Sequence, residues 1–305
     1  MYNYINAGHA KPVAARDHWI HTPGGRVLRV REDGDPGGVP LIAHHGTPGS
    51  RLPYSHWVAD ATQRGIRLIA YDRPGYGGSD RHEGRSVADA AADVEALADG
   101  LGLGRILVTG RSGGGPHALA CAALLGDRVA AAATLCGVGP YGAEGLDFLA
   151  GMGEDNVVEF GAALEGPDKL WPLLEELAPK LLDANATELV EALRSLLSPP
   201  DVAVVNDGLA AELIAATGEG IRASRAGWLD DDLAFAKPWG FELDSISVPV
   251  QLWQGRQDLM VPPAHGEWLA QHIPGVDARL SDEDGHLSIE QRRIGDAHAW
   301  LLERY

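Results

Sequence analysis

The spacing of hydrophobic positions changes several times along the chain, and each spacing predicts a different kind of element. Residues 17–22 and 26–31 are strand-like runs joined by Pro23-Gly24-Gly25, which predicts a hairpin because proline and glycine supply the backbone angles of a tight turn. Uniformly apolar runs then alternate with helical segments, as in a parallel sheet that is buried on both faces. The apolar runs are 39–43, 66–71, 105–109 and 129–135, and the helical segments are 56–65, 86–101 and 117–125.

This alternation stops after residue 140 and resumes near residue 245. Between these points the pattern predicts helices separated by Gly166-Pro167, Pro199-Pro200 and Gly218, and no strand-like run is longer than 202–205. Beyond them it predicts two strands at 248–253 and 277–281, and two helices at 264–272 and 288–302. We therefore predict one α/β core, residues 1–140 and 245–305, that is interrupted by a helical insertion over residues 141–244.

The formal charge of the 305-residue chain is −18 and is distributed unevenly. Residues 142–244 hold 21 of the 43 acidic residues but only six of the 25 lysines and arginines. Such an acidic protein repels nucleic-acid phosphates and anionic membranes, so neither is expected as a partner. Solvated helix faces account for the acidic residues of the insertion, and a preference for neutral or cationic substrates is the alternative.

Cysteine usage and the N-terminal sequence indicate a reducing compartment. The two cysteines, Cys121 and Cys136, are too few for a disulfide scaffold and lack metal-ligand spacing, so we expect them to be buried as small hydrophobic residues. The N-terminal stretch MYNYINAGHAKPVAARD has no continuous apolar segment of the kind that a signal peptide needs. We expect a soluble cytoplasmic protein that uses no metal and no other cofactor.

A glycine-rich segment, Gly110-Arg111-Ser112-Gly113-Gly114, lies between the apolar run 105–109 and a helical segment. A serine that is exposed on a sharp strand-to-helix turn is held at strained backbone angles, and small neighbours let the backbones pass closely. This context predicts that Ser112 is a nucleophile. A glycine-rich junction capped by Ser112 is the simpler alternative.

A second loop, from His44 to Gly49, follows the apolar run 39–43. Attack on a carbonyl group needs backbone N–H groups that stabilise the negative oxygen, and we expect Thr47 and Gly113 to supply them. A cis peptide before Pro48 would fix the bend of this loop. We expect His45 to brace the loop, with a place in the substrate pocket as the other possibility.

Two polar residues follow strands in the last part of the chain. Asp258 comes after the run 248–253, and His286 comes after the run 277–281. His286 would take the proton of Ser112 and return it to the leaving group, while Asp258 would orient the imidazole and stabilise its charged form. A turn aspartate and a surface histidine are the simpler interpretations of each residue taken alone.

Other residues are candidates for supporting roles. Asp72 precedes the glycine-rich segment and is expected in an ion pair or a turn, whereas Asp284 is an alternative acid beside His286. Arg111 adjoins the nucleophile and faces either the substrate pocket or a carboxylate. The aromatic residues of the insertion either line an apolar pocket or pack in the core; they are Trp171, Trp228, Trp239, Phe148 and Phe160.

Together these residues resemble the α/β-hydrolase superfamily, in particular its capped bacterial esterases and its proline-iminopeptidase-like and non-haem-haloperoxidase-like members. The resemblance spans most of the chain and implies a mostly parallel, eight-stranded sheet flanked by helices, with a helical lid inserted after the sixth strand. It also implies a triad of Ser112, Asp258 and His286, in the chain order of the family. It rests on HHGTPGS at 44–50, DRPGYGGSD at 72–80, GRSGGG at 110–115, the pattern from Trp239 through PVQLWQG to Asp258, and DGH at 284–286.

The resemblance and the residues predict a hydrolase that cleaves an ester or amide of a small molecule through an acyl-serine intermediate. Haloalkane dehalogenases and epoxide hydrolases place aspartate where this chain has Ser112, so those two activities are disfavoured. A lyase, a C–C hydrolase, or an acyl transferase or cyclase with the same triad stays open, as does a ligand-binding sensor with a vestigial triad. The expected partner is a small-molecule substrate, and nothing in the sequence indicates an oligomeric state.

Overall fold

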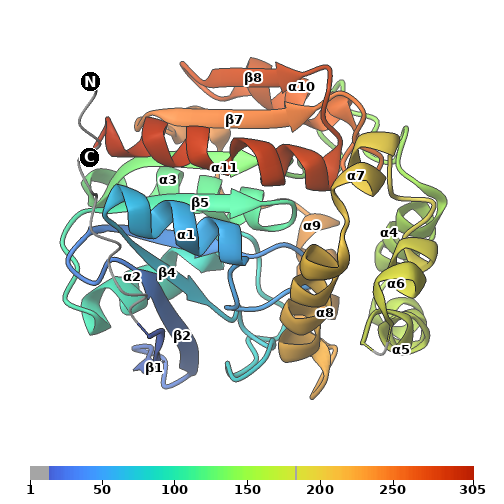
Figure 1. Ribbon diagram of the computed structural model, residues 1–305, viewed down its shortest axis with the longest axis horizontal. Coiled ribbons are helices and arrows are strands. Elements are labelled where there is room, and N and C mark those ends of the chain that lie inside the picture. The colour runs from blue at the N-terminus through green and yellow to red at the C-terminus, as the bar shows by residue number, and fades with distance from the viewer. Residues whose placement is uncertain (1–13, 183) are drawn as a thin grey trace, which may run out of the picture.

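The computed structural model describes residues 14–182 and 184–305 (Figure 1). Residues 1–13, which hold most of the N-terminal stretch searched above for a signal peptide, lie outside the described residues. The strands are β1 (Arg16–His21), β2 (Val27–Gly34), β3 (Val39–His44), β4 (Ile66–Tyr71), β5 (Ile106–Arg111), β6 (Val129–Leu135), β7 (Val250–Gly255) and β8 (Asp277–Ser281). The helices are α1 (Ser55–Arg64), α2 (Asp89–Gly100), α3 (Gly114–Leu124), α4 (Glu154–Glu165), α5 (Pro167–Leu182), α6 (Ala186–Ala192), α7 (Pro199–Val204), α8 (Asp207–Ile221), α9 (Ala226–Phe235), α10 (Pro263–His272) and α11 (His286–Leu302), with short 3₁₀ turns η1 (Gly126–Arg128) and η2 (Leu243–Ser245).

The described strands form a single sheet in the order β1-β2-β4-β3-β5-β6-β7-β8. The β1–β2 and β2–β4 pairs are antiparallel, and every other neighbouring pair is parallel. Gly110 of β5 lies opposite His44 of β3 on one side and Thr134 of β6 on the other. The carboxyl ends of these strands therefore lie level, and the loops that follow them meet at one edge of the sheet.

Helices cover both faces of this sheet. On one face, α2, α3 and α10 pack through residues such as Leu97, Leu119 and Leu269, which belong to one apolar cluster. On the other face, α1 and α11 pack through residues such as Trp57 and Ile289. Burial on both sides explains why the sequences of β5 and β6 are almost wholly apolar.

The six helices α4 to α9, here called the inserted helices, lie between β6 and β7 in the sequence. Figure 1 shows α4, α5, α6 and α8 beyond the sheet edge to which the arrows of β5 and β7 point. Leu170, Leu174, Ala178 and Leu182 recur every four residues along α5 and join a separate apolar cluster with Trp228 of α9. Within the described ranges, no helix is both long enough and apolar enough to cross a bilayer.

The predicted α/β class, the mostly parallel eight-stranded sheet and the helices after the sixth strand are confirmed, whereas the domain boundaries at residues 141 and 244 stay a prediction. The strand-like run 202–205 is an exception, because residues 202–204 lie in α7. Two prolines begin this helix, and Ser198 with Asp201 caps it, so the local start signals override the valines. Helix α11 begins at His286, two residues before the predicted start, so the histidine lies in its first turn.

Candidate active site

A cavity of about 220 Å³ lies between the carboxyl-end edge of the sheet and the inserted helices. Thr47, Ser112, Gly113 and His286 line it from the side of the sheet. The inserted helices supply a largely apolar opposite wall, which includes Leu177, Leu181, Leu189, Leu193 and Leu213. Four of the residues singled out in the sequence therefore share one cavity.

Ser112 occupies the turn between β5 and α3 with a backbone φ of 51°, in the left-handed region that non-glycine residues seldom adopt. Its N–H donates to the carbonyl oxygen of Leu135 at 2.9 Å, which ties the turn to β6. A Cβ atom at Gly110 would collide with the carbonyl group of Gly114, so glycine is needed where the two arms of the turn pass. Within the described part of the chain the Ser112 hydroxyl forms no hydrogen bond.

The loop of Thr47 lies directly beside this turn, and its Thr47–Pro48 peptide bond is cis. A Cβ atom at Gly113 would collide with the Thr47 side chain, so the two residues are in close contact. Among the described residues no acceptor takes the backbone N–H of Thr47 or of Gly113. Two residues with an unused N–H donor therefore line the same cavity as Ser112.

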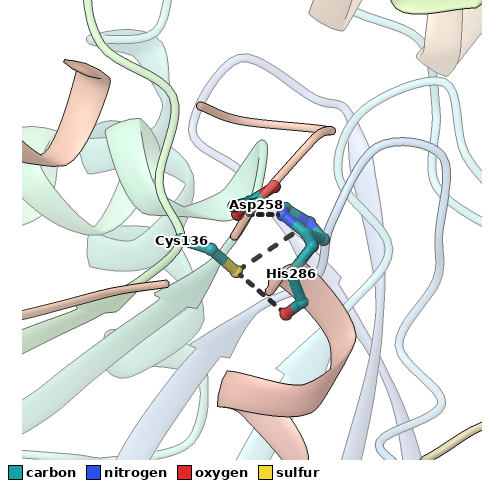
Figure 2. Close-up of side chains that lie close together, drawn as sticks. All are labelled: Cys136, Asp258 and His286. Atoms are coloured by element: carbon teal, nitrogen blue, oxygen red, sulfur yellow. Dashed lines mark hydrogen bonds and ion pairs between the residues drawn. The ribbon is translucent and has the colours of Figure 1, made fainter. Parts of the chain in front are cut away.

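His286 and Asp258 form a buried pair (Figure 2). His286 Nδ1 lies 2.8 Å from Asp258 Oδ2, and Asp258 Oδ1 accepts the N–H groups of Met260 and Val261 at 2.8 Å each. Burial by itself disfavours a charged imidazole, but the Asp258 carboxylate outweighs it and raises the pKa of His286 well above its usual value. Asp258 is thus held by the backbone, and it holds the ring of His286 in turn.

Cys136 touches the other ring nitrogen of His286 (Figure 2). It directly follows β6 with a φ of 45°, and its sulfur lies 3.8 Å from His286 Nε2. Burial raises the pKa of the Cys136 thiol, so the group stays neutral. The donor atoms of Cys136, Asp258 and His286 lie within 4.8 Å of one another, as metal ligands would. Both Asp258 oxygens already accept hydrogen bonds, which favours a hydrogen-bonded chain over a metal site.

An aspartate of the inserted helices braces the Thr47 loop. Asp231 of α9 is fully buried, accepts the Thr47 hydroxyl at 2.6 Å, and pairs with Arg73 at 2.5 Å and Arg85 at 2.7 Å. Arg73 also donates to the carbonyl of His45 and to Thr47 Oγ1 at 3.0 Å. Although burial opposes its charge, the two guanidinium groups hold the pKa of Asp231 well below its usual value.

A second aspartate of the inserted helices braces His286. Asp201 of α7 is fully buried and accepts the backbone N–H groups of His286 at 3.0 Å and of Ser288 at 2.9 Å. It also accepts the hydroxyl groups of Ser198 and Ser288 at 2.8 and 2.9 Å. The first N–H groups of a helix have no partner within the helix, so a carboxylate there is stabilised by both hydrogen bonds and the helix dipole. Asp201 thereby fixes the end of α11 that carries the histidine.

Comparison with known proteins agrees with this architecture. The family model described as alpha/beta hydrolase fold matches residues 39–173. A bromoperoxidase structure from Bacillus anthracis superposes with a TM-score of 0.71 at 20% identity, covering 94% of this chain and 100% of that one. The chain has the α/β-hydrolase fold.

Curated α/β hydrolases match shorter stretches. Epoxide hydrolase A of Mycobacterium tuberculosis is 34% identical over 125 residues, which are 40% of this chain and 38% of the relative. The non-heme chloroperoxidase of Streptomyces lividans is 32% identical over 147 residues, which are 48% of this chain and 53% of the relative. In both cases the match spans less than two thirds of the relative's length.

The other acidic and basic candidates have partners other than Ser112, Asp258 and His286. Asp284 binds Ser281 at 2.6 Å and Arg292 at 2.8 Å, and Asp72 pairs with Arg51 at 2.7 Å. Arg111 lines the cavity and also pairs with Glu290 at 3.3 Å, so it both borders the pocket and faces a carboxylate.

The candidates for the pocket divide into two groups. Trp228 and Phe160 line the cavity. The indole of Trp171 is on the surface, and Trp239 and Phe148 are buried in the core cluster, all three outside the cavity lining. His45 also lies outside this lining and braces its own loop, since Arg73 N–H donates to its Nε2 at 3.2 Å and its Nδ1 lies 2.7 Å from the Gly46 oxygen.

The sequence patterns did not indicate the roles of Asp201 and Asp231 or the contact of Cys136 with His286. One signal for Asp231 was available. Successive helical residues point about 100° apart, so the three acids Asp230–Asp232 span about 200° and cannot all face solvent on a helix that is apolar elsewhere. For Asp201 the sequence indicates only a helix cap with Ser198. It gives no signal for the contacts with His286 and Ser288, which lie 85 and 87 residues away in the sequence.

Proposed function

We propose that this protein is a serine hydrolase that cleaves an ester or amide bond of a small molecule through an acyl-enzyme at Ser112. One observation carries the proposal. A hydroxyl on a strained turn, a histidine held by a buried carboxylate, and two unused backbone N–H groups all border one cavity. Acyl transfer through serine needs these groups and no metal.

The steps follow from these positions. As Ser112 Oγ attacks the carbonyl carbon, His286 Nε2 accepts its proton, and the carbonyl oxygen becomes negative next to the N–H groups of Thr47 and Gly113. Asp258 stabilises the imidazolium that forms. The imidazolium then gives its proton to the departing alcohol or amine, which leaves an acyl ester on Ser112. Water repeats the sequence, with His286 again as the base, and releases the acid.

The identity of residue 112 favours acyl transfer over epoxide opening, despite the likeness to a protein named epoxide hydrolase. A serine that opened an epoxide would remain bound to carbon through an ether, which water does not readily cleave. A serine that attacks an ester or amide forms an acyl ester, which water does cleave. Only the second reaction lets Ser112 turn over.

Labelling with a fluorophosphonate tests the proposal. We expect one adduct per chain, located on Ser112, and none in the Ser112→Ala variant. We also expect the variant to lose at least about 10⁴-fold of kcat on p-nitrophenyl esters, as removal of a triad nucleophile does. Labelling at another residue, or full activity of the variant, would overturn the assignment.

Hydrolysis in ¹⁸O-labelled water separates this function from the lyase, cyclase and acyl-transferase alternatives that share the triad. A hydrolase places one solvent oxygen in the released acid. A lyase, cyclase or acyl transferase yields products without that oxygen. A sensor with a vestigial triad shows no turnover on a panel of esters and amides.

A further inference from the structure

We propose that Glu159 and Asp232 form a subsite for a primary ammonium group, so that the preferred ester or amide carries such a group a few bonds from its carbonyl carbon. The inference rests on the proposed function, because this carboxyl pair and Ser112 border the same cavity. Three neighbouring acids on α9 differ in whether they have a cationic partner.

The three successive acids of α9 are all buried, but only two of them have a cationic partner. Asp230 pairs with Arg81 at 2.8 Å, and Asp231 pairs with Arg73 at 2.5 Å. Asp232, whose side chain lines the cavity, forms no ion pair within the described part of the chain. It is only 1% exposed, and its Oδ2 atom has no hydrogen-bond partner. A buried carboxylate oxygen without a donor is costly, so a donor from a ligand would stabilise it.

Glu159 of α4 borders the same cavity as Asp232 and accepts the indole N–H of Trp228 at 2.7 Å. Burial raises the pKa of both carboxyl groups. Repulsion by Glu159 raises the pKa of Asp232 further, whereas a hydrogen bond with Asp232 lowers that of Glu159, so the two groups lie close together. An ammonium group would bring a positive charge and three N–H donors to this pair, including the Asp232 oxygen that lacks a partner.

The cations on the cavity wall are already paired with other acids. Lys180 Nζ lies 3.2 Å from Glu176, and Arg111 lies 3.3 Å from Glu290. The remaining acid of the lining, Asp155, accepts the hydroxyl of Ser195. The charge of the carboxyl pair is thus left for a group that enters the cavity from outside.

The helix sets the distance between this subsite and the reacting carbonyl. Trp228, Asp232 and Phe235 are spaced at i, i+4 and i+7, so they share one face of α9, and all three line the cavity. The Phe235 ring lies beside Gly113, because a Cβ atom there would come within 3.1 Å of Phe235 Cζ. Asp232 is about one helical turn, roughly 5 Å, farther along the wall. A chain of two or three atoms between the ammonium and the carbonyl carbon fits that separation.

Two p-nitrophenyl esters of equal size test the subsite by turnover. The 3-aminopropanoyl ester carries an ammonium where the butanoyl ester carries a methyl group. We expect the ratio of their kcat/KM values to fall about 10- to 100-fold in Asp232→Asn and in Glu159→Gln, which is the range for a hydrogen bond to a charged group. Asp230→Asn is the matched control: it removes the same charge two residues away, from the partner of Arg81, and should leave the ratio within about twofold. An equal ratio in wild type and Asp232→Asn would overturn the proposal.

A binding measurement tests the same subsite without turnover. In the Ser112→Ala variant, butylammonium should raise Tm more than 1-butanol does at equal concentration, and Asp232→Asn in that background should remove the difference. Equal shifts from the amine and the alcohol would overturn the subsite. Hydrolysis of the butanoyl ester and fluorophosphonate labelling do not depend on the carboxyl pair, so the serine-hydrolase proposal stands or falls on those two results.

Discussion

The sheet edge and the inserted helices contribute different kinds of groups to the cavity. The loops after β3, β5, β7 and β8 bring the groups that would react: the N–H groups of Thr47 and Gly113, the Ser112 hydroxyl, and the pair of Asp258 and His286. The inserted helices bring the apolar wall and a set of buried carboxylates.

The two regions are nevertheless coupled, because the inserted helices hold two parts of the reacting edge in place. Asp201 binds the backbone of His286, and Asp231 binds the side chain of Thr47. In the proposed reaction, a region without a reacting group would thus still determine how well the reaction proceeds. The effects expected from substitutions decrease from the sheet edge to the inserted helices.

The largest effect is expected from Asp258→Asn at the sheet edge. Asparagine has the same shape, but it no longer accepts a hydrogen bond from the N–H at His286 Nδ1 and does not stabilise the imidazolium. We therefore expect kcat to fall about 10³- to 10⁴-fold. Asp284→Asn is the matched control, since that buried carboxylate binds Ser281 and Arg292 instead of His286. Its kcat should stay within about threefold of wild type, and a greater loss from Asp284→Asn than from Asp258→Asn would reverse their roles.

Next in size is Asp231→Asn in the inserted helices. The change leaves Arg73 and Arg85 buried without their anion, so the free energy of unfolding should fall by about 3–5 kcal/mol. Urea denaturation measures the loss. Glu165→Gln, an exposed acid on α4, should change it by less than about 0.5 kcal/mol. Equal losses in the two variants would mean that Asp231 does not brace the Thr47 loop.

Asp201→Asn should have a smaller effect, on kcat rather than on KM. The amide group of asparagine presents a donor where the carboxylate accepted hydrogen bonds from backbone N–H groups of α11. His286 is therefore held less well, and we expect kcat to fall about 10- to 100-fold. KM for a p-nitrophenyl ester should change by less than about threefold, because Asp201 does not line the cavity. A rise in KM with unchanged kcat would place Asp201 in substrate binding instead.

The last prediction is a pH dependence that arises from His286 and Asp258 at the sheet edge. Only neutral His286 can accept a proton from Ser112, and Asp258 raises the pKa of His286 well above its usual value of 6.5. The value of kcat/KM should therefore rise with pH, with a midpoint above 6.5, and fall about tenfold for each unit below that midpoint. A midpoint below 6.5 would show that burial outweighs the carboxylate.

The two regions also differ in how much their sequences predict. In the sheet, the runs 66–71 and 129–135 coincide with β4 and β6, because strands that cross a covered sheet are marked by apolar runs and turn residues. The run 277–281 coincides with the edge strand β8, which is only partly buried. The positions of Ser112, Asp258 and His286 at strand ends could be predicted for the same reason. Ser112 and His286 share a cavity because parallel strands end at one edge of the sheet.

The inserted helices were predictable as helices, but their part in the site was not. Their acids follow the pattern of solvated faces, and burial of Asp201 or Asp231 depends on partners that the chain brings from far away: Asp201 binds His286, 85 residues on, and Asp231 binds Arg73, 158 residues earlier. Helical periodicity reports only neighbours three or four residues apart. Long-range pairs of this kind are visible only once the fold is known.

The position of Asp201 and Asp231 has a consequence for protein engineering. Exchanging the segment between β6 and β7 with that of a relative is an obvious way to change which substrates are accepted. Here such a chimera would also lose Asp201 and Asp231, which hold His286 and the Thr47 loop in place. We therefore expect kcat to fall in addition to any change in substrate preference. A donor segment that carries equivalent carboxylates, or a graft that retains residues 201 and 231, is the version we expect to work.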